Sequence, residues 1–120
     1  MLWSPRKRND ARQVCEGSEG HLIEPRTPEA LTRVYNFAVN QLGIDLFHCI
    51  WVGGERHSES GSYVWRWDSD ATRLPNDSPL WDENQPNENG PEERFLCLCL
   101  RDKLHDCNDS GSHPFICVLN

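Results

Sequence analysis

Long apolar runs are missing from this sequence. No stretch approaches the roughly 20 apolar residues that a membrane-spanning helix needs. Positive charge is also scarce, because 12 Lys and Arg stand against 19 Asp and Glu, which gives a formal net charge of -7. Proteins that bind nucleic acid need a basic face. We therefore expect neither a transmembrane segment nor a nucleic-acid partner.

The start of the chain lacks the apolar core and the cleavage site of a signal peptide. We therefore expect Met1 to be an added start on a mature domain. Six cysteines in 120 residues indicate an oxidising compartment, so we expect a secreted, extracellular protein. The even number allows complete pairing, and six cysteines allow about fifteen connectivities. The length predicts one domain that spans residues 1–120.

Two helices are expected in the first half of the chain. Asn9 or Asp10 is placed to cap a short first helix, which glycines then end. The second helix has a clearer start, because Thr27 is a preferred N-cap and Pro28 suits the first helical position. Its apolar residues recur on one face, and Gly43 follows them.

The second half of the chain predicts short strands and one long loop. Residues 47–52 are apolar and are expected to stop at Gly53. Residues 63–67 place Tyr or Trp at every second position, which is the pattern of a half-buried strand. Residues 74–90 form a polar loop, and long loops in compact domains tend to be functional. Two further buried strands are expected at residues 95–100 and 114–118. Helices followed by antiparallel strands make an α+β domain.

A series of short motifs in a fixed order resembles a known family. They are Asp10-Ala11 with Cys15, Gly20-His21-Leu22, Trp51-Val52-Gly53-Gly54, Trp65-Arg66-Trp67-Asp68, Trp81 before Gln85-Pro86-Asn87, Cys97-Leu98-Cys99-Leu100 before Leu104-His105-Asp106-Cys107, and Phe115-Ile116-Cys117. Over nearly its whole length the chain resembles the short form of the C-type lectin-like domain, especially invertebrate single-domain lectins such as the tunicate galactose-binding type. The resemblance implies a binding module and not an enzyme. It also implies two helices packed on short antiparallel strands, with disulfides and a long polar loop.

The resemblance implies the disulfides Cys15–Cys117 and Cys97–Cys107. The remaining pair, Cys49 and Cys99, does not occupy family positions. A third bridge between them is one interpretation, because their strands are expected to share a sheet. Two buried free thiols are the alternative, and Cys99 also competes with Cys97 for Cys107.

The resemblance implies a calcium-dependent sugar site in the long loop. The implied metal ligands are Gln85, Asn87, Glu93 and Asp106, which offer the oxygen atoms that Ca²⁺ prefers. Glu92 competes with Glu93 for its role. In the family the proline at position 86 is cis and turns both neighbouring side chains toward one ion, and two vicinal sugar hydroxyls complete the coordination of that ion. We therefore expect Ca²⁺ as a cofactor and a hexose-bearing glycan as the ligand.

The implied sugar-contacting residues are Gln85, Asn87, Glu93, His105 and Asp106. His105 departs from the family, which has Asn at this position. Neutral imidazole is a poor ligand for a hard cation, so we expect one lost calcium contact, one lost sugar hydrogen bond and weak calcium affinity. The Gln85-Pro86-Asn87 motif is a hybrid of the mannose-type Glu-Pro-Asn and the galactose-type Gln-Pro-Asp. Trp81 is considered for stacking on the sugar, with a core position as its alternative.

Three other functions are weighed against this one. The main rival is a C-type lectin-like domain that has lost calcium and sugar binding and recognises a protein or lipid, which the change at His105 favours. A zinc site would use the group Cys97, Cys99, His105, Cys107 and His113, but disulfides would remove its thiolates. A hydrolase based on His105 and Asp106 lacks the glycine-rich calcium loop that such chemistry needs. Because single lectin sites are weak, a homodimer is considered as a source of avidity.

Overall fold

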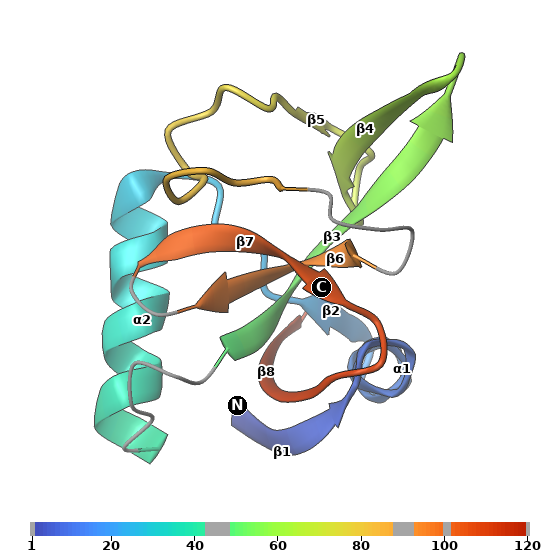
Figure 1. Ribbon diagram of the computed structural model, residues 1–120. Helices are drawn as coiled ribbons and strands as arrows, with labels where there is room; N and C mark the ends of the chain where they lie inside the picture. Colours follow the sequence, from blue (N-terminus) through green and yellow to red (C-terminus); the bar gives the residue numbers. More distant parts are fainter. Residues whose placement is uncertain (1, 43–48, 88–92, 100–101, 120) are drawn as a thin grey trace.

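Strand β3 (Cys49–Glu59) lies at the centre of the sheet. The computed structural model describes residues 2–42, 49–87, 93–99 and 102–119. In chain order the other elements are β1 (Leu2–Lys7), α1 (Arg8–Gly17), β2 (Gly20–Leu22), α2 (Pro28–Leu42), β4 (Ser62–Trp67), β5 (Arg73–Leu74), β6 (Glu93–Cys99), β7 (Lys103–Asn108) and β8 (Ser112–Leu119) (Figure 1). Within these ranges, no helix is both long and apolar enough to cross a membrane.

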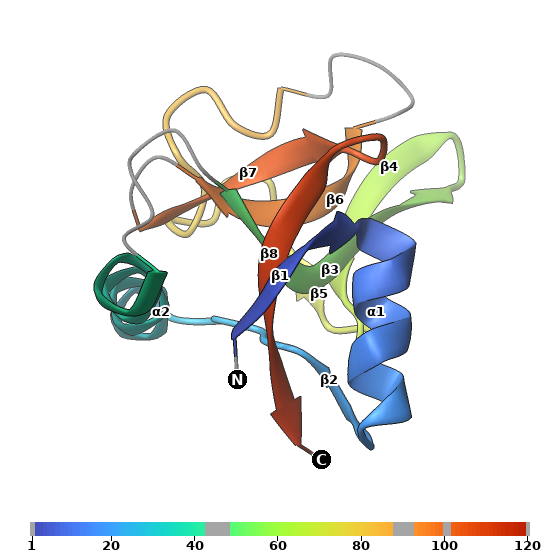
Figure 2. The same ribbon diagram turned by 90° about the horizontal axis from the view of Figure 1, so that it is seen from below.

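The strands are mostly antiparallel. β3 pairs in antiparallel fashion with β4 and β6, and it meets β8 in parallel at the pair Trp51 and Phe115. On one side β7 pairs with β6, and on another β5 pairs with β4. Both β1 and β2 pair with β8. Figure 2 shows the two helices on opposite sides of the strands. The expected α+β fold, with two helices on antiparallel strands, is confirmed.

β3 is longer than the sequence predicted. The strand was expected to stop at Gly53, but it continues through Gly54 to Glu59. Both glycines allow neighbouring residues to pack closely against the strand, and neither forms a turn. A Cβ at Gly53 would lie 2.8 Å from the carbonyl oxygen of Leu22, and a Cβ at Gly54 would overlap the side chain of Leu96. The prediction was wrong because the sequence does not reveal which neighbour approaches a glycine.

α1 begins earlier than the sequence predicted. Its N-cap is Lys7, which makes no side-chain capping hydrogen bond, so the prediction that Asn9 or Asp10 caps the helix was wrong. Arg8 occupies the first turn instead and is only 1% exposed. Its Nη2 donates to Asp68 Oδ2 at 2.7 Å, and its guanidinium lies 4.9 Å from the ring centre of Phe95. This buried ion pair draws the start of the helix into the protein interior.

α2 begins where the sequence predicted. The backbone N–H of Ala30 donates to Thr27 Oγ1 at 3.1 Å, which is the expected N-cap bond, and Pro28 is the first helical residue. The apolar face packs into the core through Leu31 and Ala38, which are 1% and 3% exposed. Gly43, expected to close the helix, lies outside the described residues.

Three disulfides staple the fold. They are Cys15–Cys117 between α1 and β8, Cys97–Cys107 between β6 and β7, and Cys49–Cys99 between β3 and β6. Both bridges that the resemblance implied are confirmed, and so is the third bridge. The alternative of two free thiols is wrong, because no cysteine is free. Trp51, Trp65 and Trp67 belong to the core, with exposures of 0%, 0% and 3%.

Candidate functional site

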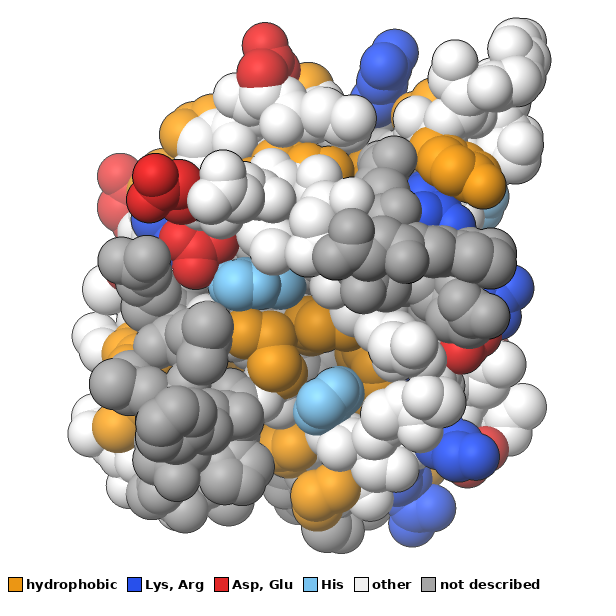
Figure 3. Space-filling view, viewed as in Figure 1, with side chains coloured by type: hydrophobic (Ala, Val, Ile, Leu, Met, Phe, Trp, Pro, Cys, Tyr) orange, Lys and Arg blue, Asp and Glu red, His pale blue; other side chains and the backbone are white. Residues whose placement is uncertain are grey.

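The polar loop after β5 is attached to β7 by backbone hydrogen bonds. The N–H of Leu104 donates to the carbonyl of Leu80 at 2.8 Å, and the N–H of Asp82 donates back to the carbonyl of Leu104 at 3.0 Å. Trp81 forms a bridge with Leu104 between these two bonds. In Figure 1 the loop runs beside β7, and the space-filling view of the same face in Figure 3 shows acidic and histidine side chains close to one another. This attachment brings the loop residues Asp82 and Gln85 next to His105 and Asp106.

Trp81 belongs to the core. Its side chain is 6% exposed, and its ring meets the ring of Trp65 edge to face with the centroids 5.3 Å apart. The indole N–H donates to the carbonyl of Pro75 at 3.0 Å. A ring buried in this way offers no open face to a sugar. We therefore assign Trp81 to the core, the second of the two roles considered from the sequence.

Gln85 and Asp106 meet where the loop contacts β7. The backbone N–H of Asp106 donates to Gln85 Oε1 at 3.3 Å, and the side chain of Asp106 is largely buried. The Gln85–Pro86 peptide bond is cis, as the resemblance implied. Asn87, on the other side of Pro86, is exposed. The structure therefore brings the side-chain amide of Gln85 to the backbone of Asp106, a residue that the family resemblance placed in the same site.

Glu93 lies at the same end of the sheet. Glu93 is the first residue of β6. Its backbone pairs with that of Asn108, which lies two residues beyond Asp106 on β7. Its side chain and its competitor Glu92 lie outside the described parts of the structure. The backbone position is compatible with the role expected for Glu93.

His105 is bound to a residue that the sequence did not single out. Its Nε2 lies 2.9 Å from Asp82 Oδ2, and the two side chains are 15% and 10% exposed. Because a carboxylate only accepts hydrogen bonds, Nε2 carries the proton and offers no lone pair to a metal. Nothing near Asp82 in the sequence signals this pair, which exists only because the loop is attached to β7.

The donor atoms at this site suit a hard cation. Gln85 places an amide oxygen against the backbone of Asp106, whose side chain is a carboxylate, and oxygen is the ligand that Ca²⁺ prefers. Among the described residues, only a group of four cysteines brings three or more His, Cys, Asp or Glu ligand atoms within 4.8 Å of one another. A calcium ion would therefore need the amide oxygens of Gln85 and Asn87 in addition to the carboxylates expected from Asp106 and Glu93.

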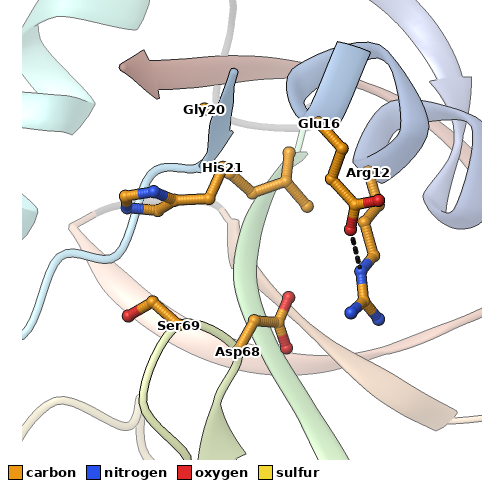
Figure 4. Close-up of a pocket in the computed structure, with 7 residues that line it drawn as sticks. Arg12, Glu16, Gly20, His21, Asp68 and Ser69 are labelled. Atoms are coloured by element: carbon orange, nitrogen blue, oxygen red, sulfur yellow. Dashed lines mark hydrogen bonds and ion pairs between the residues drawn. The ribbon is translucent and has the colours of Figure 1, made fainter. Parts of the chain in front are cut away.

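A separate pocket of about 220 Å³ lies between α1, β2 and the turn after β4. Figure 4 shows Arg12, Glu16, His21, Asp68 and Ser69 around it. Arg12 Nε donates to Glu16 Oε1 at 2.8 Å, which raises the pKa of Arg12, and Asp68 is held by buried Arg8. None of the described residues expected in the sugar site lines this pocket, and its charged groups are already paired, Arg12 with Glu16 and Asp68 with Arg8.

Comparisons with known proteins give one consistent family. The family model for the lectin C-type domain matches residues 4–119. A lectin of the tunicate Polyandrocarpa misakiensis is 34% identical over 73 residues, which make up 58% of this chain and 55% of that lectin. The matched segment thus spans about half the length of that relative.

Solved structures show the same fold. The structure of TC14, a C-type lectin from Polyandrocarpa misakiensis, matches with a TM-score of 0.75 and 23% identity, over 98% of this chain and 94% of that one. The carbohydrate-recognition domain of the human scavenger receptor C-type lectin matches with a TM-score of 0.73 and 24% identity, over 95% and 83% of the two chains. At these identities the likeness concerns the fold alone.

Proposed function

Because this chain belongs to the C-type lectin domain family, we propose that it binds a hexose on extracellular glycans through a calcium ion held between the loop and β7. Carbohydrate recognition is the general function of the family, and the family is non-catalytic. The expectation of a binding module and not an enzyme is therefore confirmed. The comparisons do not favour recognition of a protein or lipid in place of a sugar, and we do not propose it.

The observation that supports the proposal most is the contact between Gln85 Oε1 and the backbone of Asp106, at 3.3 Å. Gln85, Asn87, Glu93 and Asp106 would hold the ion. A bound Ca²⁺ would supply open coordination positions for two vicinal hydroxyls of the sugar. The oxygen and nitrogen atoms of the same amide and carboxylate side chains would hydrogen-bond those hydroxyls and orient the ring.

His105 has a positioning role in this proposal. Its hydrogen bond to Asp82 joins the loop to β7 directly beside Asp106. It contributes no oxygen atom, so we propose weak calcium binding, with a dissociation constant of roughly 10⁻⁴ to 10⁻³ M, as in other extracellular modules. The hybrid Gln85-Pro86-Asn87 motif supports galactose-type or mannose-type hexoses. Homodimer formation would raise the avidity of such weak single sites.

Thermal unfolding in Ca²⁺ and in EDTA tests the calcium part of this proposal. At ~10 mM Ca²⁺ and the affinity given above, binding to the folded state alone would stabilise the protein by about 1.4 to 2.7 kcal/mol. For a domain of this size the melting temperature should rise by several degrees. Asp106→Ala should lose most of this rise. An equal melting temperature in Ca²⁺ and EDTA would show that the loop holds no ion.

A further inference from the structure

The turn that joins β7 to β8 carries an Asn-x-Ser motif. The motif consists of Asn108, Asp109 and Ser110, and it matches the pattern of an N-glycosylation acceptor, in which the middle residue is not proline. The backbone N–H of Gly111 donates to the carbonyl of Asn108 at 3.4 Å, which closes the turn. Both Asn108 and Ser110 are exposed. The motif therefore lies on the surface, where a bulky sugar chain has room.

The hydrogen bonds of this turn leave the reactive atom of Asn108 open. The backbone N–H and the hydroxyl of Ser110 both donate to Asn108 Oδ1, at 2.8 and 2.7 Å. The side-chain nitrogen of Asn108, to which a glycan would be attached, makes no hydrogen bond with the described residues. A glycosylated asparagine keeps its side-chain carbonyl, so both bonds from Ser110 would remain after the modification. The folded turn is therefore compatible with a glycan on Asn108.

The neighbours of Asn108 place the motif beside the candidate sugar site. The carboxylate of Asp109 forms an ion pair with Arg94 on β6, so the middle residue of the motif is held by β6 and not by Asn108. The backbone of Asn108 pairs with that of Glu93, and Asn108 lies two residues beyond Asp106 on β7. Asn108 itself is not one of the proposed calcium ligands. A glycan here would lie close to the candidate site and would occupy none of those ligands.

A second Asn-x-Ser motif, at residues 76–78, has a different local structure. Pro79 follows directly and restricts the backbone of Ser78. The hydroxyl oxygen of Ser78 accepts a hydrogen bond from the backbone N–H of Leu80 at 3.2 Å. Within the described residues, no hydrogen bond joins Ser78 to Asn76. The hydroxyl of this motif is therefore bonded on its C-terminal side and not to the asparagine.

We propose that Asn108 is N-glycosylated during secretion and that Asn76 is not. This proposal rests on the extracellular location proposed above. A transferase of the secretory pathway supplies the sugar from an oligosaccharide linked to a lipid diphosphate. The side-chain nitrogen of Asn108 forms a bond to the anomeric carbon of the sugar, while the bond from that carbon to the diphosphate oxygen breaks. The lipid diphosphate leaves with the electron pair, and the proton lost from the nitrogen passes to a base of the transferase.

Peptide mapping of the full chain, produced in insect cells behind an added leader peptide, tests this site. Secreted and cell-retained protein are both treated with an N-glycosidase in water labelled with heavy oxygen, which converts each glycan-bearing asparagine to a labelled aspartate. A sample without the glycosidase corrects for spontaneous deamidation. Trypsin separates the two motifs, because Arg94 lies between them. We expect label at Asn108 and none at Asn76, whether or not the protein binds a hexose. An unlabelled Asn108, or label at Asn76, would overturn the proposal.

Two serine variants test whether the motif itself directs the modification. Ser110→Ala removes the hydroxyl that the motif requires and should lose the glycan, which lowers the intact mass of the secreted protein. Ser112→Ala removes the hydroxyl of an exposed serine two residues further along the chain and should keep the glycan. Asn108→Gln should also lose the glycan, and Asn76→Gln should keep it. A glycan that persists in Ser110→Ala, or disappears in Ser112→Ala, would count against the assignment.

Discussion

Replacing Cys15 and Cys117 together by serine is expected to lower the free energy of unfolding by about 4.7 kcal/mol, because their bridge closes a loop of about 100 residues. The two cysteines are 102 positions apart, and the bridge ties α1 to β8. Without it the unfolded chain gains conformational freedom that the folded chain does not. Since small domains are stable by only about 5 to 15 kcal/mol, this change alone removes from about a third to nearly all of that stability. Urea unfolding of the two proteins measures the difference.

Replacing Cys97 and Cys107 together by serine is the matched variant, which separates the effect of loop closure from the cost of burying a serine side chain. Cys97 is as fully buried as Cys15, with 0% exposure for both. The bridge from Cys97 to Cys107 spans only 10 positions, so removing it should cost about 2.7 kcal/mol in the same chain-entropy model. Equal losses in the two double variants would show that burial, and not loop length, determines the effect.

Alanine at Asn87 or at Asp106 is expected to weaken hexose binding by at least about tenfold while the fold stays intact. Each change removes oxygen atoms that would bind both the ion and the sugar, and a lost bond to a charged group costs about 1.5 to 3 kcal/mol. Asp106→Ala keeps the backbone N–H that donates a hydrogen bond to Gln85 Oε1, so the loop stays attached to β7. Calorimetric titration with the sugar in Ca²⁺ measures the loss.

Glu83→Ala is the control for these two variants. Glu83 is an exposed acidic residue of the same loop, and only its backbone N–H contacts Asp82. It should bind the sugar as the wild type does. If Glu83→Ala weakens binding as much as Asp106→Ala, the effect comes from the charge of the loop. If neither Asn87→Ala nor Asp106→Ala changes binding, the assigned site is wrong.

Local sequence signals predicted the parts of the fold that depend on local physics. The Thr27-Pro28 start of α2 satisfies backbone donors within a few residues, and the observed N-cap bond follows. The alternation around Trp65 likewise predicted a buried strand position. The prediction of where α1 starts was wrong because Arg8, in the first turn, is held by Asp68, which lies sixty positions away in the sequence. No local pattern contains that partner.

In the candidate site, too, some features were predicted from the sequence, and others depend on residues far apart in the chain. Its loop residues were predicted through the family resemblance, and the meeting of Gln85 with Asp106 agrees with that set. The pairing of His105 with Asp82 was not predicted, because it depends on the register between the loop and β7. The closeness of the four cysteines is also a consequence of strand register, which places Cys49 directly opposite Cys99.

Titration of the protein with galactose and with mannose, first in millimolar Ca²⁺ and then in EDTA, tests whether the chain binds a hexose through calcium. We expect that at least one of these hexoses binds one site per chain in Ca²⁺, and that binding disappears in EDTA and returns when Ca²⁺ is restored. Binding that persists unchanged in EDTA, or no binding of either hexose in Ca²⁺, would contradict it.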